Sequence, residues 1–600
     1  MAANQYVSMR NLRYLIFDVF EGLELTKLDY FKEHNRDTFD MTLDAAKQIG
    51  DTLLFPLYEE MDKHKPEYAN GSITVHPKVR EIMETFGEGG WINAPKEFDK
   101  GGQQMPFLVY NIATTILHAA NTAATAFPLL TAGAANLIDS FGSDELKAAY
   151  LQQMWAGKWQ GTMALTEPQA GSSLSDITSS ATPTENGYYK INGQKIFISG
   201  GDHDGVDNII HLYLARIDGA PAGVKGISLF VVPKYRIENG EPVFNNVTTA
   251  GAFGKLGIKG APIAHIMAGE QGECRGWLVG EPNKGLGYMF RLMNEARIGV
   301  GQISTGLASA AYYASLQYAN ERPQGRPVSN KDVNLPQTLI IHHADVKRML
   351  LLQKAMVEGS FALIAQCSLW ADVAERGTGE EAANAHLLLE LLTPICKSYP
   401  AETGMTSVSN GLQVLGGAGF CDDFPLQQYY RDMRINPIYE GTTAIQAMDL
   451  LGRKITMKGG MAVMLFNNEV NKTIEAAKAN EAVKTYAEKL AKTQEKLVQV
   501  TMNLMGLAQS EQPEVFLRDA SLYLEYFSLF TVGWLWLKQG LVSARALENH
   551  PQGEEAVFHK SKLHTLRYYF EYELPKTRGL HDRLTSTDRL TLELAPEEIV

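Results

Sequence analysis

The stretch Met163–Ser173, MALTEPQAGSS, lies where the pattern of the sequence changes from helical to β-rich. Before it, apolar residues recur at three- and four-residue spacing, as in Ser143–Trp159, where Ser143 can cap a helix. After it, β-rich pieces such as Tyr188–Ser199 and Gly226–Tyr235 alternate with turns rich in Gly and Asn. Because these strands are separated by turns rather than crossover helices, the pattern predicts an antiparallel β domain.

Helical patterns resume after Pro282 and continue almost to the end of the chain. A chain of 600 residues is too long for one hydrophobic core. We therefore predict an α+β fold with four parts: an N-terminal helical domain (1–160), a middle antiparallel β domain (161–280), a C-terminal four-helix bundle (281–460) and an extra C-terminal helical domain (468–600).

Charge and cysteine content narrow the classes of function. The 55 basic and 68 acidic residues give a net charge of −13, which disfavours nucleic acid as a partner. The four cysteines lie far apart and form no C-x-x-C pair, so neither a disulfide framework nor a zinc site is predicted. The N-terminal sequence has no signal-peptide pattern, and the expected location is cytoplasmic.

Two apolar stretches resemble membrane spans but fit buried helices better. Gly101–Ile138 has no charged residue, yet Asn, His and Pro residues interrupt it, and we expect buried helices that break at Pro128. The run Tyr526–Leu537 is shorter than the roughly 17–25 residues that cross a bilayer. No membrane association is therefore predicted.

Several common cofactor and metal motifs are missing from the sequence. Gly299 and Gly301 are followed by Ser304, so no G-x-G-x-x-G dinucleotide motif is present, and the Walker A, G-x-S-x-G and H-E-x-x-H patterns are absent too. The cluster Asp202–Asp207 could coordinate a cation, but turns use the same residue types, and we predict no metal.

Three other segments have two interpretations each. The hydroxyls of Thr166, Ser172 and Ser173, together with the aromatic Phe197, suit a flat ring with polar edges, although an ordinary hairpin would have the same pattern. Gly416 and Gly417 allow a ligand to approach the backbone closely, or simply end a helix. Arg322 and Arg326 suit a pyrophosphate, but loop arginines are commonly just solvated.

Glu440, in the stretch Ile435–Ile455, is the only acidic residue between Asp432 and Asp449. The residues after it have helical spacing, and Thr442 or Thr443 can cap the helix. An acid at that position stabilises a helix N-terminus, so the stretch by itself favours a structural carboxylate over a catalytic one.

The order of these motifs resembles the acyl-CoA dehydrogenase family. TEP-x-AGS, K-x-F-I-S, R-x-G-x-G, ER-x-x-G-R, GG-x-G-F, YRD and I-YEGT-x-x-IQ follow one another between about Thr38 and Ile455. The sequence is most similar to the long bacterial members that include 3-methylmercaptopropionyl-CoA dehydrogenases and broad fatty acyl-CoA dehydrogenases, which share an added C-terminal helical region.

The resemblance implies an enzyme that oxidises an acyl-CoA thioester to its trans-2-enoyl-CoA with noncovalent FAD. Glu440 of YEGT corresponds to the family base, which removes the α-proton while flavin N5 accepts the β-hydride. The backbone N–H of the base and a flavin ribityl hydroxyl polarise the thioester carbonyl. Glu295 is the second position that we consider for the base, since some relatives carry it on an earlier helix.

The same resemblance implies the binding residues. The expected FAD contacts are Met163, Leu165, Thr166, Gly171, Ser172, Phe197, Ile198, Ser199, Arg322, Gln324, Gln413, Gly416, Gly417, Gly441 and Thr442. The expected substrate contacts are Ser172, Asn294 and Arg297, with Asn294 standing where many relatives carry Asp. Pro323 and His343 depart from the family pattern on the phosphate side.

The resemblance also implies partners. FAD in the family crosses a subunit interface, so a homodimer is expected. The shorter family members are tetramers, and the extra C-terminal helices are expected to pack where the second dimer of such a tetramer lies. Electron-transfer flavoprotein is the expected electron acceptor in β-oxidation of fatty acids. Two alternatives share the fold: an acyl-CoA oxidase or other flavoenzyme, and a non-enzymatic DNA-associated relative, whose basic face the net charge of −13 does not suggest.

Overall fold

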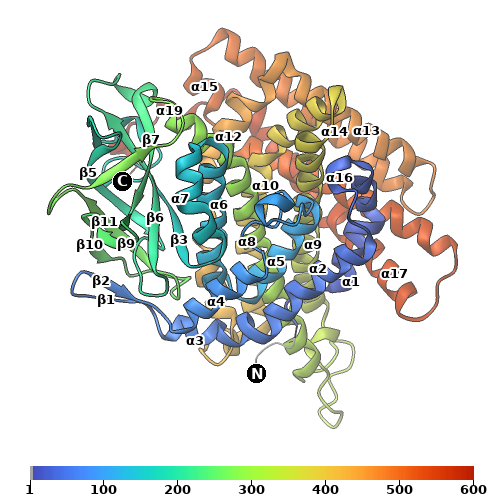
Figure 1. Ribbon diagram of the computed structural model, residues 1–600. Helices are drawn as coiled ribbons and strands as arrows, with labels where there is room; N and C mark the ends of the chain where they lie inside the picture. The colour runs from blue at the N-terminus through green and yellow to red at the C-terminus, as the bar shows by residue number, and fades with distance from the viewer. Residues whose placement is uncertain (1–4, 600) are drawn as a thin grey trace. The chain divides into compact units, whose positions relative to one another are not determined.

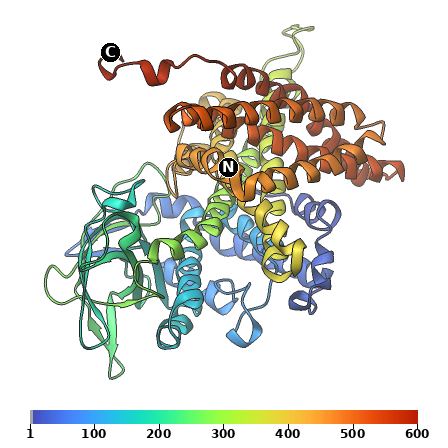
Figure 2. The same ribbon diagram turned by 90° about the horizontal axis from the view of Figure 1, so that it is seen from above.

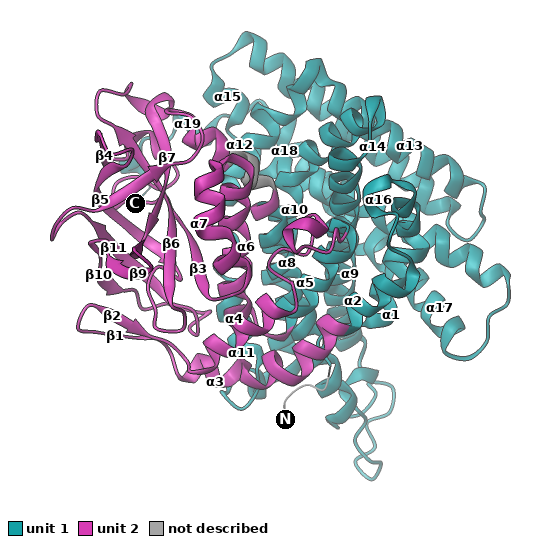
Figure 3. Cartoon of the chain, viewed as in Figure 1, with its two compact units in different colours: residues 1–44, 106–119, 297–600 teal, residues 45–105, 120–296 magenta. Residues whose placement is uncertain are grey.

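The computed structural model describes residues 5–599, except the side chains of 290–294. The chain divides into two compact units, shown in Figure 3. One unit comprises residues 45–105 and 120–296, and contains the β-sheet. The other comprises residues 1–44, 106–119 and 297–600, and its described elements are helical. These units do not test the four-part domain division, which stays a prediction.

The unit with the sheet, called the sheet unit below, is unit 2 in Figure 3. An eight-stranded sheet forms its centre, with strand order β10-β11-β5-β12-β7-β6-β3 and β4 pairing with both β5 and β6. Strand β7 (Ile227–Pro233) is buried along its whole length and β6 over eight of its ten residues, as expected of central strands made of apolar residues. The other strands are β3 (Trp159–Ala164), β4 (Ser180–Pro183), β5 (Tyr189–Ser199), β6 (Asn208–Ile217), β10 (Val247–Ala252), β11 (Ile263–Ala268) and β12 (Arg275–Leu278), drawn in green in Figure 1.

Most neighbouring strands are antiparallel, as the turn pattern predicts, but two pairs are parallel. Strand β3 runs parallel to β6, from the pair Trp159 with Asn208 to the pair Ala164 with Tyr213. Strand β4 also pairs with β6 in the parallel direction. The long segment after β3 and the β4–β5 hairpin provide the crossover that parallel pairing needs. This connection has a short 3-10 turn at Leu174–Asp176 but no α-helix, so the sequence pattern did not indicate a crossover.

Helices α6 (Thr122–Phe141) and α7 (Asp144–Trp155) pack against the β3 edge of the sheet. A Cβ atom added at Gly161 would lie 2.6 Å from Ala134 Cβ and 2.8 Å from Met154 Cε, so the helices approach this strand as closely as a glycine allows. The core between them holds apolar residues of both helices and of β6 and β7. The unit also contains α3 (Tyr58–Lys63), α4 (Lys78–Glu88) and the hairpins β1–β2 (Glu67–Ala69, Ser72–Thr74) and β8–β9 (Tyr235–Glu238, Glu241–Phe244).

Long helices build the other unit, called the helical unit below, which is unit 1 in Figure 3; Figure 2 shows these helices from above. Its longest helices are α8 (Gly285–Glu321, whose residues up to 296 belong to the sheet unit), α9 (Ala344–Arg376) and α10 (Gly379–Leu415). The remaining helices are α1 (Met9–Arg13), α2 (Arg36–Ile49), α5 (Phe107–Ala120), α11 (Leu426–Met433), α12 (Thr443–Gly452), α13 (Met461–Lys478), α14 (Lys484–Ser510), α15 (Pro513–Leu517), α16 (Ala520–Glu548), α17 (Gly553–Tyr568), α18 (Thr577–Leu584) and α19 (Leu590–Glu593).

The C-terminal helices are packed onto the bundle through α16. Trp536 Nε1 donates a hydrogen bond to the carbonyl oxygen of Ala355 in α9 at 3.0 Å, and Trp534 stacks on Trp370 with ring centroids 6.2 Å apart. Gly359 of α9 allows α16 to approach closely, because a Cβ atom added at Gly359 would lie 2.7 Å from Val532 Cγ1 of α16. The apolar run Tyr526–Leu537 is therefore a part of α16 that is buried on all sides.

A buried polar cluster joins three parts of this unit. Lys562 of α17 donates to Glu358 of α9 at 2.8 Å and to Gln539 of α16 at 3.1 Å, and it also contacts the Asn11 side chain near the N-terminus. Lys562 and Glu358 are both buried. Because a buried charge is costly without a partner, this cluster holds the N-terminal segment and the C-terminal helices to the same helix.

The expected helix break in the charge-free stretch lies at Asn121 and not at Pro128. Helix α5 ends at Ala120, and α6 begins at Thr122 with the Asn121 side chain accepting from the N–H of Ala124. The prediction was wrong because the side chain of Asn121 caps the new helix, while Pro128 is accommodated inside it. No helix in the described part of the chain combines the length and hydropathy of a membrane span.

Candidate active site

Glu440 adopts a left-handed backbone conformation, with φ of +53°, and Gly441 after it has φ of +86°. A non-glycine residue pays about 1–2 kcal/mol for this conformation. Helix α12 begins at Thr443, three residues after Glu440, and Thr442 Oγ1 caps it by accepting from the N–H of Ile445 at 3.4 Å. The strained turn places Glu440 just ahead of a helix N-terminus, where the residue is accessible to solvent although the surrounding protein desolvates its carboxylate.

Hydrogen bonds on both sides of Glu440 hold this turn in place. The Gln446 side chain donates to the carbonyl oxygens of Glu440 at 3.1 Å and Gly441 at 3.4 Å. Thr443 donates its N–H to the carbonyl oxygen of Pro437 at 3.1 Å and its hydroxyl to Glu402 of α10. Among the described residues, no acceptor takes the N–H of Glu440 itself. A free N–H therefore lies next to the carboxylate.

Two basic side chains lie near enough to Glu440 to influence its ionisation. Desolvation by the surrounding protein raises the pKa of Glu440, and the charges of Lys397 and Arg297 oppose that rise. Arg297 is buried and donates to Asp449 of α12 at 2.6 Å. Arg297, predicted to meet the substrate, is thus paired with a carboxylate within its own unit.

In the sheet unit, the end of β5 is reshaped by a β-bulge. The pairing of β5 with β11 shifts register between Ala264 and Ile266, which face Ile198 and Lys195. Phe197 lies in this irregularity with φ of +60°, and 55% of its surface is exposed. A bulge re-aims the side chain at its centre, and here it presents an aromatic face that contacts Phe253 at 4.7 Å between ring centroids. An ordinary hairpin strand would not need this distortion.

A buried ion pair joins the two predicted cofactor segments, Met163–Ser173 and Lys195–Ser199. Lys195 Nζ donates to Glu167 Oε1 at 2.8 Å and to the carbonyl oxygen of Leu165 at 3.0 Å, and both charged side chains are fully buried. Glu167 also accepts from the N–H of Thr178 at 2.6 Å and of Ser179 at 3.1 Å. Burial would raise the pKa of Glu167, but Lys195 and these hydrogen bonds bring it down to about 2. The two segments therefore share one satisfied network.

The remaining predicted contacts are distributed over both units. Met163, Leu165 and Thr166 are partly exposed, Ile198 is buried, and Gly171, Ser172 and Ser199 are exposed, all in the sheet unit. Arg322, Gln324, Gln413, Gly416 and Gly417 are exposed in the helical unit, where Gly441 and Thr442 are partly exposed. The side chain of Asn294 lies outside the described residues. Glu295, exposed, accepts from Asn136 at 3.1 Å.

The glycine pair at the end of α10 leaves open space on its surface. Gly416 ends the helix with φ of +59°, and a Cβ atom added at Gly416 or Gly417 would meet nothing within 4 Å. Arg326, by contrast, is used inside its own loop, where it donates to the carbonyl oxygens of Leu335 and Val333 at 2.8 and 2.9 Å. The backbone at Gly416 and Gly417 is thus accessible to a ligand, while Arg326 is already engaged.

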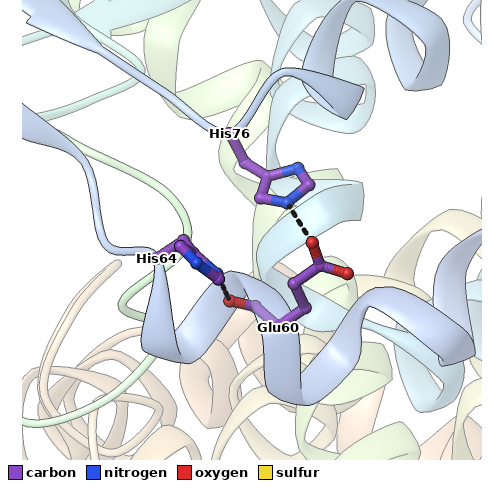
Figure 4. A group of neighbouring side chains, drawn as sticks. All are labelled: Glu60, His64 and His76. Atoms are coloured by element: carbon purple, nitrogen blue, oxygen red, sulfur yellow. Dashed lines mark hydrogen bonds and ion pairs between the residues drawn. The ribbon is translucent and has the colours of Figure 1, made fainter.

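One group of potential metal ligands occurs among the described residues, and Figure 4 shows it: Glu60, His64 and His76, whose ligand atoms lie within 4.8 Å of one another. The N–H of Lys78 donates to His76 Nδ1 at 3.2 Å, so neutral His76 carries its proton on Nε2, which faces Glu60 Oε1 at 3.1 Å. His64 Nδ1 faces the carbonyl oxygen of Glu60 at 3.1 Å. These bonds satisfy the group without a cation.

The acidic cluster Asp202–Asp207 is similarly engaged. Asp202 pairs with Lys234 and accepts from Thr249, Asp204 accepts from the N–H of Val75, and Asp207 pairs with Arg80. Each carboxylate thus has its own partner and a structural role.

Sequence reasoning did not assign a role to Lys195, Glu167 or Lys397. Lys195 and Glu167 belong to motifs that the sequence analysis quoted, yet their pairing across 28 residues depends on the fold. Lys397 carries a readable signal, since it is the lone charge between Glu390 and Glu402 in an apolar stretch.

Comparison with known proteins identifies the family. Four family models match along the chain: the acyl-CoA dehydrogenase N-terminal domain (37–158), middle domain (162–269) and C-terminal domain (283–455), and the acetyl-CoA dehydrogenase C-terminal-like domain (466–595).

Two relatives cover almost the whole chain. 3-methylmercaptopropionyl-CoA dehydrogenase of Ruegeria pomeroyi is 36% identical over 96% of this chain and 97% of its own. A butyryl-CoA dehydrogenase of Syntrophomonas wolfei is 32% identical over the full length of both. Among solved structures, an acyl-CoA dehydrogenase from Bacillus anthracis complexed with FAD has a TM-score of 0.73 at 19% identity, covering 94% of this chain and 90% of its own, and so shares the fold.

We predict that Lys195→Met will strongly destabilise the sheet unit. The substitution leaves the Glu167 carboxylate buried without its counter-charge, which costs about 3–5 kcal/mol. Chemical unfolding followed by circular dichroism measures this loss.

Lys190→Met is the matched control on the same strand. Lys190 pairs with Glu273 at 3.1 Å with 54% of its side chain exposed, so its loss costs less than about 1 kcal/mol. Equal effects of the two substitutions would show that the buried pair contributes nothing special.

Proposed function

Because the chain belongs to the acyl-CoA dehydrogenase family, and is therefore an oxidoreductase acting on acyl-CoA, we propose that it catalyses FAD-dependent α,β-dehydrogenation of an acyl-CoA thioester to the trans-2-enoyl-CoA. Glu440 is the proposed base. The observation that carries the proposal is the strained turn at Glu440, which presents an exposed carboxylate beside a free backbone N–H at the start of α12.

The geometry around Glu440 suits proton abstraction from carbon. The α-proton of a thioester is weakly acidic, so its removal requires that the carbonyl oxygen be stabilised as the base acts. The N–H of Glu440 has no acceptor among the described residues and is proposed to donate to that oxygen. The carboxylate takes the α-proton, and the bond between the α- and β-carbons becomes double.

The residues present fit noncovalent FAD. In the sheet unit, the bulge presents Phe197 as an aromatic face, with the hydroxyls of Thr166, Ser172 and Ser199 for polar ring edges. In the helical unit, the accessible backbone at Gly416 and Gly417 and the exposed Arg322 would hold the phosphate side. When bound, FAD would supply the electron acceptor, with N5 taking the β-hydrogen and its electron pair.

The proposed substrate is a fatty acyl-CoA or 3-methylmercaptopropionyl-CoA. Relatives that cover at least 96% of the chain are named for a thioether acyl group, for butyryl and for broad specificity toward linear acyl groups. Electron-transfer flavoprotein is the proposed acceptor of the electrons, in β-oxidation of fatty acids. The proposed location is cytoplasmic, supported by four free cysteines, three of them buried.

The Glu440→Gln variant is expected to keep bound FAD and its affinity for acyl-CoA. Reduction of its flavin by acyl-CoA is expected to be about 10²–10⁴-fold slower than in wild type. The amide has nearly the same shape as the carboxylate and cannot accept the proton. Anaerobic stopped-flow absorbance of the flavin band measures the rate. Glu295→Gln, the same change at the second candidate position, serves as the control, and the proposal is wrong if that variant is the slow one.

We expect anaerobic titration of the yellow protein with acyl-CoAs to bleach the flavin. A panel of 3-methylmercaptopropionyl-CoA, butyryl-CoA and long-chain acyl-CoAs identifies the acyl group, because one methylene changes binding by about 1–3 kcal/mol. Acetyl-CoA has no β-carbon and should leave the flavin oxidised. A colourless protein that FAD cannot reconstitute would contradict the assignment. Rapid reoxidation of the bleached flavin by air would favour the alternative, an acyl-CoA oxidase.

We expect the protein to be a homodimer in solution. The proposed FAD contacts fall into two groups, and in the family the second group belongs to the neighbouring subunit. The C-terminal helices that pack against α9 would take the place of a second dimer. Light scattering or native mass spectrometry measures the mass, and a tetramer would refute the role given to these helices.

A further inference from the structure

Lys397 lies in the middle of α10 and is fully buried. Pro394 and Pro400 flank it within the helix. Because proline has no N–H, the carbonyl of Cys396 loses its usual helical partner at position 400. Gly301 of α8 approaches that carbonyl so closely that an added Cβ would lie 2.4 Å from its oxygen. Lys397 is therefore enclosed where α8 and α10 meet.

The Lys397 ammonium differs from the other fully buried lysines described here. Lys195, Lys454 and Lys562 each contact a carboxylate directly: Glu167, Glu390 and Glu358. Lys397 Nζ has no hydrogen-bond partner within the described residues. Since a buried unpaired charge is strongly disfavoured, a function that needs the positive charge would explain its presence.

The elements around Lys397 converge on the turn that carries Glu440. Arg297 of α8 binds Asp449 at 2.6 Å, and Glu402 of α10 accepts from the hydroxyl of Thr443. The charges that act on Lys397 are those of Glu402, Glu440 and Arg297. Arg297 already has Asp449 as its counter-ion, whereas Lys397 Nζ has no hydrogen-bond partner within the described residues.

We propose that Lys397 is a positioning residue whose ammonium keeps the Glu440 carboxylate ionised and oriented when a bound acyl chain excludes water. This inference rests on the proposed function. Excluding water removes solvation from the carboxylate and favours its protonated form, in which it cannot act as a base. A fixed positive charge on a rigid helix opposes that change without contacting the substrate.

The charge balance gives the direction of the effect on pH dependence. Desolvation by the surrounding protein raises the pKa of Glu440, while the charges of Lys397 and Arg297 lower it. Burial lowers the pKa of Lys397 to about 8, against the opposing charges of Glu402 and Glu440. Removing the ammonium leaves the rise in the Glu440 pKa unopposed except by Arg297. The base of the variant then ionises at higher pH.

The test is the pH profile of anaerobic flavin reduction in Lys397→Met, using the acyl-CoA that bleaches wild-type protein fastest. We expect the profile to move up by about one pH unit, which makes reduction about tenfold slower on the acidic side. The rate should approach that of wild type at high pH. Flavin content and the spectral change on binding a product enoyl-CoA show whether the site is intact.

Three further variants separate the charge from structural effects. Lys397→Arg retains the charge and should restore the wild-type profile, and Lys397→Gln serves if the methionine variant does not fold. Lys538→Met removes a partly buried lysine, whose Nζ lies over the Phe20 ring and 3.4 Å from Gln366 Oε1, and should leave the profile unmoved.

Two outcomes would overturn the proposal for Lys397. One is an unmoved profile in charge-removing variants that keep flavin and ligand binding. The other is a change in preference among acyl-CoAs without a change in pH dependence, since it would place the ammonium against the acyl chain. Wild-type protein that no acyl-CoA reduces would contradict the proposed function itself, and with it this role.

Discussion

A carboxylate that takes a proton from carbon has to stay ionised in surroundings that favour its neutral form. Water is excluded for the sake of the chemistry, yet water is what normally stabilises the charge. Around Glu440, the compensating charges come from Lys397 and Arg297, which lie on the long helices α10 and α8. Helices hold a charge at a fixed distance, and the Arg297–Asp449 pair also joins α8 to α12, the helix that follows Glu440.

The two parts of the candidate site share a construction principle. Each has a non-glycine residue in the left-handed conformation, Phe197 in the sheet and Glu440 before α12. Each lies beside a polar network with few degrees of freedom, Glu167 with Lys195 in one case and Gln446 with the turn carbonyls in the other. Strained conformations persist only where such neighbours determine them fully. The strain at both positions is consistent with residues that must point in one direction.

Much of the architecture was predictable from the sequence. The ordered motifs identified the family, and the change from helical spacing to turn-separated strands identified the α+β fold, which the family models and the structure confirm. Local patterns did not show what depends on distant partners. The parallel pairing of β3 with β6 arises through a crossover without an α-helix, and the α5–α6 break depends on the side chain of Asn121 rather than on Pro128.

The site was predictable to a different degree. Motif order indicated Glu440 and the residues proposed to bind FAD, and those roles stay predictions. The bulge at Phe197 could not be predicted from the sequence, because the residues around it have the ordinary periodicity of a strand. Arg297 matched a family position for substrate contact, but its pairing with Asp449 spans 152 residues of sequence. Lys397 shows how a lone charge in an apolar stretch signals a site when its surroundings are known.

The buried cluster at Lys562 bears on how the long members of such a family differ from shorter ones. Glu358 lies in α9, within the bundle itself, and its carboxylate is neutralised by Lys354 and by Lys562 from the C-terminal helices. Deleting those helices would remove Trp534 and Trp536, uncover their partners Trp370 and Ala355 in α9, and leave Glu358 with one of its two lysines. The surface of α9 therefore depends on the C-terminal helices: without them, Glu358 would keep only Lys354 as its counter-ion, and apolar residues of α9 would be open to solvent.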